Sequence, residues 1–257
     1  FTLDEKEEIT NGIQVQQECV NKKSLEILGK NYRLNEGIFN LTTEELEYLN
    51  LNQNELEIVK PLFTSNEINR YNTKRENKNW VIYTDSSFKD IEKMNNYPNL
   101  KYHLDRFKDV ITTDNKPYGI HRARNEYFFK GEKILSLRKC VNRPLFSYVD
   151  FDSYVNQAYY VIKSNRINLK YLTALLNSNL IAFWLKYKGK MQGNNFQVDK
   201  EPLLNIPILY IENNPLILNE INTCRDELEQ FEYFSPHCFR HSFATRCFEA
   251  GVQPKTV

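Results

Sequence analysis

Basic and aromatic side chains are concentrated in the segment from Lys116 to Arg124, whose sequence is Lys-Pro-Tyr-Gly-Ile-His-Arg-Ala-Arg. Arginine and lysine can pair with the edge of guanine, and tyrosine can stack on a base or touch the methyl group of thymine. Asparagine and glutamine suit adenine in the same way, and Asn125 directly follows the segment. These residue types therefore favour contact with nucleic acid.

A second polar stretch combines positive charge with side-chain amides. It contains Lys186-Tyr-Lys-Gly-Lys190 and Gln192-Gly-Asn-Asn195. Its two glycines allow the backbone to approach a phosphate or the edge of a groove, and its amides can donate and accept hydrogen bonds there. The candidate binding residues of this stretch are Lys186, Lys188, Lys190, Gln192, Asn194 and Asn195.

The net charge of +1 conceals an asymmetry along the chain. Between Lys101 and Arg143 there are eleven basic and five acidic residues, an excess of six positive charges, whereas the first sixty residues lean acidic. Such a protein can present one basic face to phosphates while another face is solvated or contacts a partner domain. A chance cluster of surface lysines is the alternative, because charge patterning is not specific.

The composition is that of an ordinary globular protein, with 257 residues, 41% hydrophobic and 26% charged. Its longest apolar stretch, at residues 180–185, is far shorter than the roughly 18 residues of a membrane helix, so we expect no membrane contact. The chain opens on Phe1 without a recognisable signal peptide. Five widely spaced cysteines, an odd number, favour reduced thiols and a cytoplasmic protein.

Several short elements are expected to position these groups. Thr42 or Thr43 can cap a helix that continues to Leu49, with carboxylates in its first turn. The aromatic and β-branched residues at 79–84 indicate a buried strand. A helix is expected near residues 102–110. Further strands are predicted at residues 127–129, 133–138 and 157–162.

From residue 169 to residue 186 the hydrophobic period changes to three and four, which predicts one amphipathic helix packed on the body. Its apolar positions are Leu169, Leu172, Leu176, Leu180, Phe183 and Trp184. We interpret this stripe as core, because such stripes fill cores far more often than they bind ligands. The elements together predict an α/β (mixed α+β) fold.

Short motifs in a fixed order carry a resemblance to a known family. In the first half these are Asn11-Gly-Ile13, Gly37-Ile-Phe-Asn-Leu41 with Glu44-Glu-Leu46, and Lys60-Pro-Leu-Phe63 with Ile68-Asn-Arg-Tyr71. In the second half they are the run from Arg124 to Arg138, the stretch from Tyr171 to Trp184, Gly189-Lys-Met-Gln-Gly193 and Leu204-Asn-Ile-Pro-Ile208. Over about residues 9–210 the chain resembles the TaqI-like C-terminal specificity domain, the target-recognition domain of adenine-specific DNA methyltransferases and type IIG restriction-modification enzymes.

The resemblance implies a target-recognition domain with a mixed sheet body and packed C-terminal helices that binds double-stranded DNA sequence-specifically. It also implies that an arginine-bearing segment lies close to DNA just before the Phe-Phe-x-Gly-x-Lys-Ile strand. The leading contacts are then Tyr118, His121, Arg122 and Arg124, with Lys133 as a phosphate contact and Arg138 at the end of that strand. The alternatives are an ion pair of Arg124 with Glu126 or Asp150, and a satisfied surface imidazole at His121.

Motifs for catalysis are absent from the sequence. An amino-methyltransferase of this class needs a glycine-rich loop for S-adenosylmethionine and an Asn-Pro-Pro-Tyr-type motif for the flipped adenine, and the chain has neither. The acidic residues lie mostly in helical surface patterns rather than in the carboxylate clusters of a nuclease. We therefore expect no catalysis by this polypeptide alone, with S-adenosylmethionine and Mg²⁺ required only by catalytic domains outside it.

The last twenty-five residues resemble a different family. His237 and Arg240 match the His-x-x-Arg box of tyrosine recombinases (phage integrases), where this pair helps to neutralise the scissile phosphate. No tyrosine follows the box, so we expect an inactive fragment. A zinc site is a weaker alternative, because only two of its four candidate ligands are closely spaced. Those four are Cys224, His237, His241 and Cys247.

The chain is thus expected to have four regions. They are a connector from a missing catalytic domain at 1–30, the DNA target-recognition domain at 31–210, a helical segment at 211–232 and the truncated tyrosine-recombinase-like tail at 233–257. Three functions remain open. The first is a specificity module with its methyltransferase or endonuclease domain in cis, the second a stand-alone type I-like specificity subunit acting in trans, and the third a degenerate tyrosine-recombinase-related DNA-binding protein.

Overall fold

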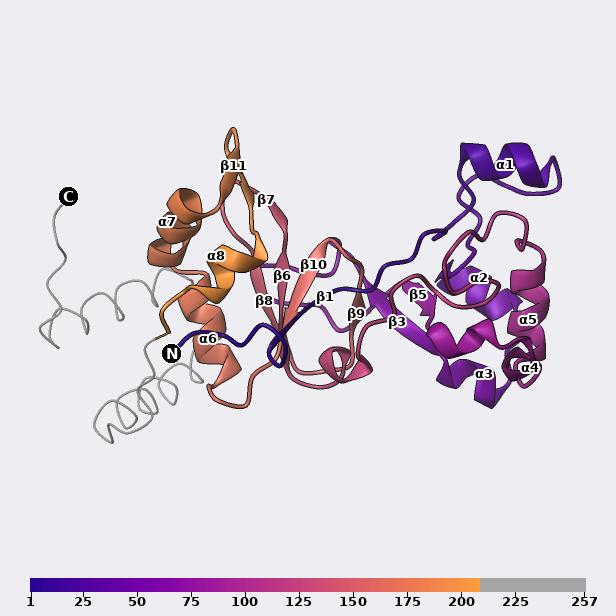
Figure 1. Cartoon of the computed structure of the whole chain (residues 1–257), viewed down its shortest axis with the longest axis horizontal. Helices are drawn as coiled ribbons and strands as arrows, with labels where there is room; N and C mark the ends of the chain where they lie inside the picture. Colours follow the sequence, from indigo (N-terminus) through magenta and orange to yellow (C-terminus); the bar gives the residue numbers. More distant parts are fainter. Residues whose placement is uncertain (209–257) are drawn as a thin grey trace, which may run out of the picture. The chain divides into compact units, whose positions relative to one another are not determined.

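A five-stranded sheet in the order β1-β10-β6-β8-β4 is the largest sheet of the computed structural model, which describes residues 1–208 (Figure 1). Neighbouring strands are antiparallel except for β4, which runs parallel to β8. The strands are β1 (Ile9–Asn11), β4 (Tyr71–Asn72), β6 (Lys133–Leu137), β8 (Phe146–Val149) and β10 (Tyr159–Ile162). The central strand β6 is buried from Lys133 to Ser136, because elements cover both of its faces.

A second sheet has four strands in the order β2-β5-β3-β9. They are β2 (Asn40–Thr42), β3 (Val59–Phe63), β5 (Asn79–Ile82) and β9 (Tyr154–Val155). The first three are antiparallel, and β9 runs parallel to β3. Residues 156–158 then lead from β9 directly into β10 of the five-stranded sheet, so one short turn joins the two sheets.

The strands predicted at residues 79–84, 133–138 and 157–162 are confirmed as β5, β6 and β10. The strand predicted at residues 127–129 is wrong. These residues form the 3₁₀-helix η2 (Glu126–Phe129), which begins where Asn125 Oδ1 accepts a hydrogen bond from the backbone N–H of Tyr127 at 3.0 Å. Aromatic content suggested a strand, but the capping side chain of Asn125 favours a turn at this point.

Short helices accompany the four-stranded sheet. The helix predicted to begin at Thr42 or Thr43 is confirmed as α2 (Thr43–Tyr48), with a capping box in which Thr42 Oγ1 accepts from Glu45 N and Glu45 Oε2 accepts from Thr42 N. The helix predicted near residues 102–110 begins earlier and ends at Asp105, because Pro98 favours the first turn. The others are α1 (Lys22–Leu28), α3 (Gln53–Glu57), η1 (Ser86–Lys89), α4 (Ile91–Met94) and α5 (Pro98–Asp105).

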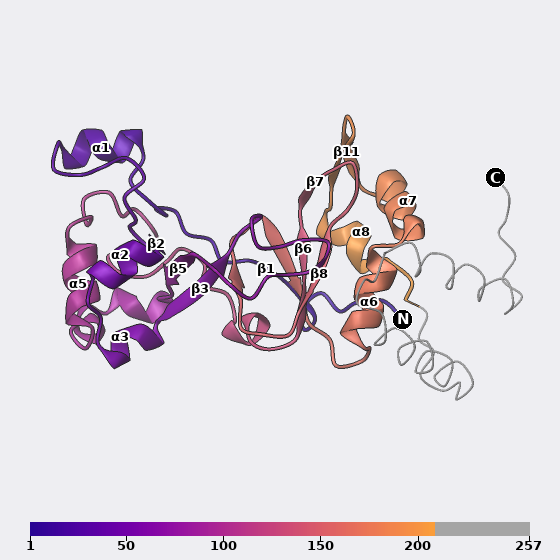
Figure 2. The ribbon, with the colours of Figure 1, turned by 180° about the vertical axis from the view of Figure 1, so that it is seen from behind.

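The single long helix predicted at residues 169–186 is wrong. The structure has two helices, α6 (Leu169–Leu176) and α7 (Asn179–Lys188), followed by α8 (Lys200–Leu204). Asn177 ends α6, and the side chain of Ser178 caps α7 by accepting from the N–H of Ile181. In both ribbon views these three helices lie together on one side of the five-stranded sheet (Figures 1 and 2).

The break changes which side chains of the predicted stripe are buried. Leu169, Leu172 and Leu176 belong to the core as expected. Leu180 and Phe183 of α7 are instead 68% and 61% exposed, and Ile181 and Leu185 are buried in their place. A two-residue interruption resets the helical phase, so a periodic pattern that continues across it assigns the wrong face to the second helix.

A small antiparallel sheet in the order β11-β12-β7 completes the fold. Its strands are β7 (Lys139–Val141), β11 (Lys190–Gln192) and β12 (Asn195–Gln197). The turn between β11 and β12 consists of Gly193 and Asn194, and the φ of +61° at Gly193 is a left-handed conformation that glycine adopts without strain. β7 follows β6 after the single residue Arg138.

Residues 2–206 form one compact unit. Residues 9–11, which the sequence suggested as part of a connector, pair with β10, and Ile13 and Val20 lie in the core. The helical segment and the tail predicted at residues 211–257 lie outside the described residues. The fold is mixed α/β as predicted. Within residues 1–208, no helix has the length and apolar character needed to cross a bilayer.

Candidate functional site

The loop that carries Arg122 and Arg124 is held on both sides by backbone groups. The N–H and C=O of Arg122 pair with the C=O and N–H of Gln14 at 3.0 and 2.9 Å. The hydroxyl of Tyr83 donates to the carbonyl oxygens of Ala123 and Arg124, each at 3.1 Å. Arg124 has a φ of +68°, which is uncommon for a residue with a side chain and is maintained here by these contacts.

Arg124 is half-buried without an acidic partner. None of the ion pairs within residues 1–208 includes Arg122 or Arg124, and the buried Nε of Arg124 has no hydrogen-bond partner among the described residues. Burial, and then repulsion from Arg122, lowers the pKa of the Arg124 guanidinium. An arginine stays protonated nevertheless, so this loop presents uncompensated positive charge.

The alternative ion pairs considered for Arg124 are not formed. Glu126 pairs instead with Lys60 and Lys130, each at 3.2 Å, and accepts a hydrogen bond from Tyr154. Asp150 pairs with Arg75 at 2.7 Å. Neither carboxylate compensates the charge of Arg124.

His121 lies at the start of the same loop and is half-buried. Its Nδ1 is 3.6 Å from a carboxylate oxygen of Asp114, although it makes no hydrogen bond within residues 1–208. The charged neighbour of this ring nitrogen is Asp114. The imidazole thus has a carboxylate neighbour but no hydrogen bond at Nδ1 among the described residues, and its predicted contact with DNA stays a prediction.

Tyr118 has a structural position rather than an exposed one. It is 4% exposed, its hydroxyl donates to Asp105 at 2.7 Å, and its carbonyl accepts from Thr84. Burial, with the hydrogen bond to Asp105, raises the pKa of Tyr118 to about 12. This side chain has almost no surface left for a ligand, so we exclude it from the candidate site.

Lys133 does not reach solvent, which corrects its predicted role as a phosphate contact. It lies at the start of the central strand β6 and is 0% exposed. Its Nζ donates to the carbonyl oxygens of Gly131 at 2.8 Å and Phe151 at 2.6 Å. Burial lowers the pKa of Lys133 to about 7. The side chain joins two loops across the end of the sheet.

Arg138 lies at the junction of β6 and β7. Its guanidinium donates to the carbonyl of Gln157 at 3.2 Å and lies 5.1 Å from the centre of the Tyr160 ring. Its Nε is buried and has no partner within the described chain. Its backbone N–H donates to Ala158 and its carbonyl accepts from Val198. Arg138 therefore connects the turn after β9 with the small sheet.

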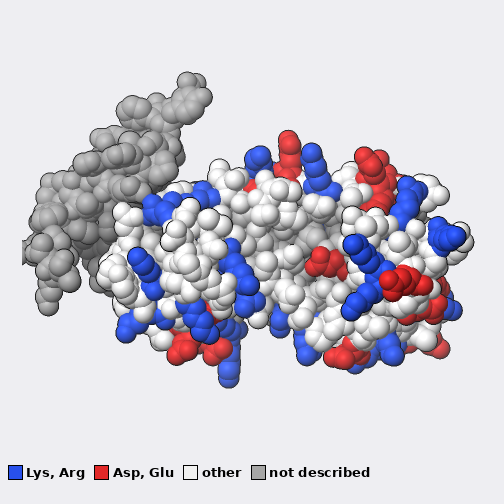
Figure 3. Space-filling view, turned by 90° about the horizontal axis from the view of Figure 1, so that it is seen from above, with Lys and Arg blue, Asp and Glu red and all other residues white. Residues whose placement is uncertain are grey.

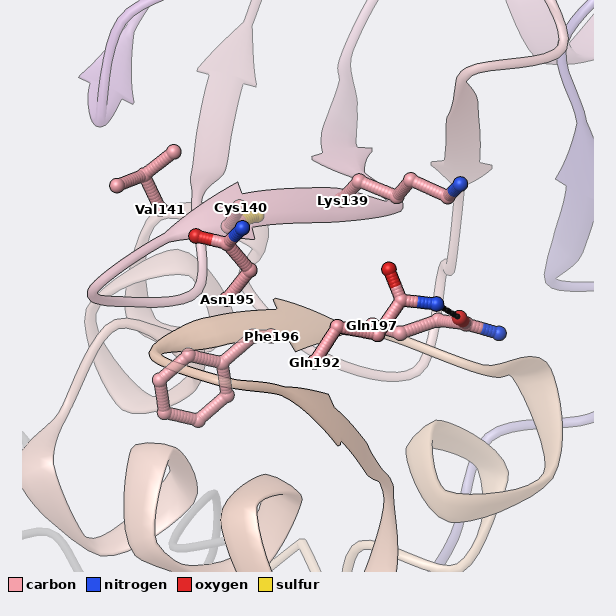
Figure 4. A pocket seen from close by; sticks show the side chains of 7 residues that line it. All are labelled: Lys139, Cys140, Val141, Gln192, Asn195, Phe196 and Gln197. Carbon is pink, nitrogen blue, oxygen red and sulfur yellow. Dashed lines mark hydrogen bonds between the residues drawn. The ribbon is translucent and has the colours of Figure 1, made fainter.

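The small sheet presents a polar outer face. Two rows of residues run across the three strands β11, β12 and β7. One row is Lys190, Gln197 and Lys139, and the other is Gln192, Asn195 and Val141. Side chains alternate along a strand, so these positions share one side of the sheet. Cys140 and Phe196 lie on the other side and are buried, and Figure 4 shows Phe196 pointing away from Asn195.

Hydrogen bonds order one part of this outer face. Asp199 pairs with Lys190 at 3.5 Å and accepts from the amide of Gln197 at 2.9 Å. The amide of Gln192 donates to Gln197 Oε1 at 3.4 Å, the dashed line in Figure 4. Asn195 makes no side-chain hydrogen bond among the described residues, and Val141 beside it is 73% exposed.

A depression at the small sheet has a volume of about 90 Å³, and residues from both sides of β7 and β12 line it. It is lined by Lys139, Cys140, Val141, Gln192, Asn195, Phe196 and Gln197. Small-molecule sites usually enclose about 300–1,000 Å³. The face therefore suits the edge of a larger ligand rather than an enclosed cofactor.

Exposed lysines continue from the end of α7. Lys186 and Lys188 lie in its last turn, near the rings of Tyr187 and Trp184 at 5.7 and 6.0 Å. Asn194 is exposed at the hairpin turn, and its carbonyl accepts from Asn142. From above, Lys and Arg predominate over the part with α7 and the hairpin, whereas both signs of charge mix over the part with α1 and α5 (Figure 3).

Backbone hydrogen bonds connect the arginine loop with the small sheet. Ile13, next to Gln14 in the chain, donates to Val155, just before the turn of residues 156–158 that contacts Arg138. The loop of His121, Arg122 and Arg124 is thus connected through the backbone of residues 13–14 and 155–158 to Arg138, at the start of the small sheet. The sequence predicted Gln192 and Asn195 but missed Lys139, Val141 and Gln197, whose only signal was the two-residue period of β7 and β12.

Within residues 1–208, no group of three or more His, Cys, Asp or Glu side chains is arranged to hold a metal ion. The alternative zinc ligands, from Cys224 to Cys247, lie outside the described residues, as do His237 and Arg240. The candidate site is therefore a surface of cations, amides and one apolar side chain.

The family model described as the TaqI-like C-terminal specificity domain matches residues 60–208 of this chain. Among curated proteins, the chain is 32% identical over 131 residues to the type II methyltransferase M.HincII of Haemophilus influenzae. It is 30% identical over 134 residues to the type II methyltransferase M.HindII of H. influenzae strain Rd. Each match covers 45% of this chain but 26% and 25% of the relative, so the chain spans about a quarter of their length.

Among solved structures, the chain is similar to the type IIL restriction-modification enzyme MmeI, solved in complex with DNA. The TM-score is 0.57 at 13% sequence identity, and the match covers 89% of this chain and 29% of that chain. At this identity the similarity concerns the fold.

Proposed function

Because this chain belongs to the TaqI-like C-terminal specificity domain family, we propose that it recognises a specific sequence in double-stranded DNA. In this proposal the methyltransferase or endonuclease chemistry belongs to another domain in cis or to a subunit in trans. S-adenosylmethionine and Mg²⁺ are then required there and not by this chain. The protein acts by placing that chemistry at its target sequence.

The observation that carries the proposal is the unpaired guanidinium of Arg124. A half-buried arginine without an acidic partner among the described residues, beside a second arginine, leaves positive charge that an external anion can compensate. The acidic side chains considered as partners are already paired with other residues. DNA supplies such acceptors as phosphate oxygens and as the O6 and N7 atoms of guanine.

The finer assignment is to an adenine-specific methyltransferase or a type IIG restriction-modification enzyme. The motif order in the sequence supports it, and the two methyltransferases of Haemophilus influenzae are consistent with it. A stand-alone specificity subunit is the alternative. Methyltransferase motifs upstream in the same reading frame distinguish the first arrangement from a separate methyltransferase gene, which would indicate the second.

Selection from random duplexes tests the function. We expect the full chain at low salt to enrich one sequence, and Arg122→Ala or Arg124→Ala to lose preference at one position, since a bidentate arginine contact contributes about 1–3 kcal/mol. Arg33→Ala is the matched control, because Arg33 is an exposed arginine outside this surface. Failure of the chain to enrich any sequence would refute the proposed function. Unchanged preference in both arginine variants would place the recognition surface elsewhere.

The region 233–257 is proposed to be a tyrosine-recombinase-like fragment that takes no part in recognition. A chain that ends at residue 232 tests this in the same selection. We expect it to enrich the same sequence as the full chain. Loss of enrichment on removing the tail would assign DNA contacts to that region.

A further inference from the structure

We propose that Asn195 and Val141 together recognise one A·T base pair in the major groove, an inference that rests on the proposed DNA-binding function. Asn195 contacts the edge of adenine, and Val141 contacts the methyl group of thymine. The two residues are directly opposite each other on β12 and β7. Opposed side chains have Cβ atoms about 4.5–5.5 Å apart and share one face of the sheet, so one ligand edge can meet both.

Val141 is the apolar member of an otherwise polar face. It is 73% exposed, and the other outward positions of the sheet are lysines and amides. The buried residue Cys140 beside it provides the packing of β7. An exposed valine contributes nothing to that core. Its branched methyl groups fit a small apolar partner, and the thymine C5-methyl is the apolar group that base pairs present in the major groove.

Asn195 has the free amide of this face. The amides of Gln192 and Gln197 hydrogen-bond each other, and Gln197 is also fixed by Asp199. Asn195 has no such contact among the described residues, so both its donor and its acceptor are available. A carboxamide can donate to adenine N7 and accept from adenine N6 at the same time. No other base offers that pair of atoms at its major-groove edge.

The surroundings of the pair suit DNA. A β-ribbon can enter the major groove, and β7 and β12 form antiparallel neighbours whose outer face carries both residues. Lys139 lies two residues before Val141 on β7, and Lys190 lies on the neighbouring strand β11, opposite Gln197. Ammonium groups at such positions can contact the phosphates that border the groove. The face thus combines one adenine contact and one methyl contact with cations at its edges.

Modified duplexes test the inference once selection has given the sequence that the full chain prefers. Each A·T position is replaced in turn by 7-deazaadenine, which lacks the N7 acceptor, or by deoxyuridine, which lacks the methyl group of thymine. At one position we expect the natural chain to lose about five-fold or more in affinity with 7-deazaadenine. At the same base pair it should lose about four-fold with deoxyuridine.

The variants assign each loss to a residue. Asn195→Ala should bind the natural and the 7-deazaadenine duplex equally, and Val141→Ala should bind the natural and the deoxyuridine duplex equally. Asn54→Ala, an exposed asparagine on α3, is the matched control and should keep both losses. Thermal melting of each variant checks that it folds.

Three results would overturn the inference. The first is a selected sequence that contains no A·T position. The second is that 7-deazaadenine and deoxyuridine reduce affinity at different base pairs. The third is that Asn195→Ala or Val141→Ala still loses the full affinity with its modified duplex. These differ from failure of the proposed function, which appears earlier as absence of any selected sequence.

Discussion

Arg124 and Lys133 lie nine positions apart in the chain, and both are basic side chains with reduced contact to water. The ammonium of Lys133 is satisfied by two carbonyl oxygens of its own fold. The Nε of Arg124 is not satisfied within residues 1–208. Lys133 is therefore a structural cation, whereas Arg124, which has no acidic partner among the described residues, is the proposed DNA-binding cation.

The burial of Lys133 predicts a pH-dependent stability. Its pKa is about 7 in the folded chain and about 10.4 when unfolded. Below pH 7 the lysine is charged in both states, and folding bears the cost of burying that charge. From pH 7 to about 10 the unfolded chain binds more protons, so stability rises with pH. Over this pH range, we expect the free energy of unfolding of the natural chain to rise by up to about 1.4 kcal/mol per pH unit relative to that of Lys133→Met.

Urea unfolding at pH 7, 8 and 9 measures this difference. Lys23→Met is the matched control, because Lys23 is exposed on α1, and its curve should stay parallel to that of the natural chain. Parallel curves for the natural chain and Lys133→Met would show that the buried amine keeps its proton across this range.

At the scale of elements, Asn177 determines how α6 and α7 meet the sheet. Its buried amide donates to the carbonyls of Phe146 and Thr173 and accepts from the N–H of Phe146. Its own carbonyl accepts from Arg70. One side chain therefore terminates α6 and pairs with the backbone of β8. The exposed face of α7 follows from that break.

Replacing Asn177 by alanine should destabilise the chain strongly. Two backbone groups of Phe146 lose a buried partner, at a cost of about 1–3 kcal/mol each, so we expect a total loss of about 2–6 kcal/mol. Urea unfolding measures it, with the exposed substitution Asn54→Ala as the control near zero. A loss below about 0.5 kcal/mol, the size of an ordinary surface substitution, would mean that water replaces the amide.

The sequence predicted elements better than it predicted their faces. Capping at Thr42 and the apolar content of β5, β6 and β10 are local signals, so these elements could be anticipated. The break at Asn177 depends on Phe146, thirty-one residues away. The burial of Tyr118 likewise depends on Asp105. Such long-range partners leave no periodic signal in the chain.

At the scale of the whole chain, basic and acidic residues are unevenly distributed, because the first sixty residues lean acidic and a later segment is basic. The segment from Lys101 to Arg143 carries an excess of six positive charges although the net charge is +1. Lys186 and Lys188 add exposed cations at the end of α7. Mobile ions are released when such cations meet phosphates, so duplex affinity should fall with salt.

Fluorescence anisotropy across a salt series measures that dependence. Lys188→Ala should weaken binding to all duplexes alike and lower the slope of log affinity against log salt by about 0.9, the contribution of one phosphate contact. Lys23→Ala, an exposed lysine on α1, is the control and should leave the slope unchanged. A response of the natural chain that stays flat from low to moderate salt would contradict a phosphate-binding face.

The alternation of side chains in the small sheet has a consequence for evolution. Cys140 and Phe196 face inward and hold β7 and β12, while Val141, Asn195 and their outward neighbours face the solvent. A mutation at an outward position leaves the inward packing intact, because the two sets of positions share no contacts across the strand. Descendants of this chain can therefore exchange their outward residues one at a time, each intermediate still folded, and acquire new target preferences on an inherited scaffold.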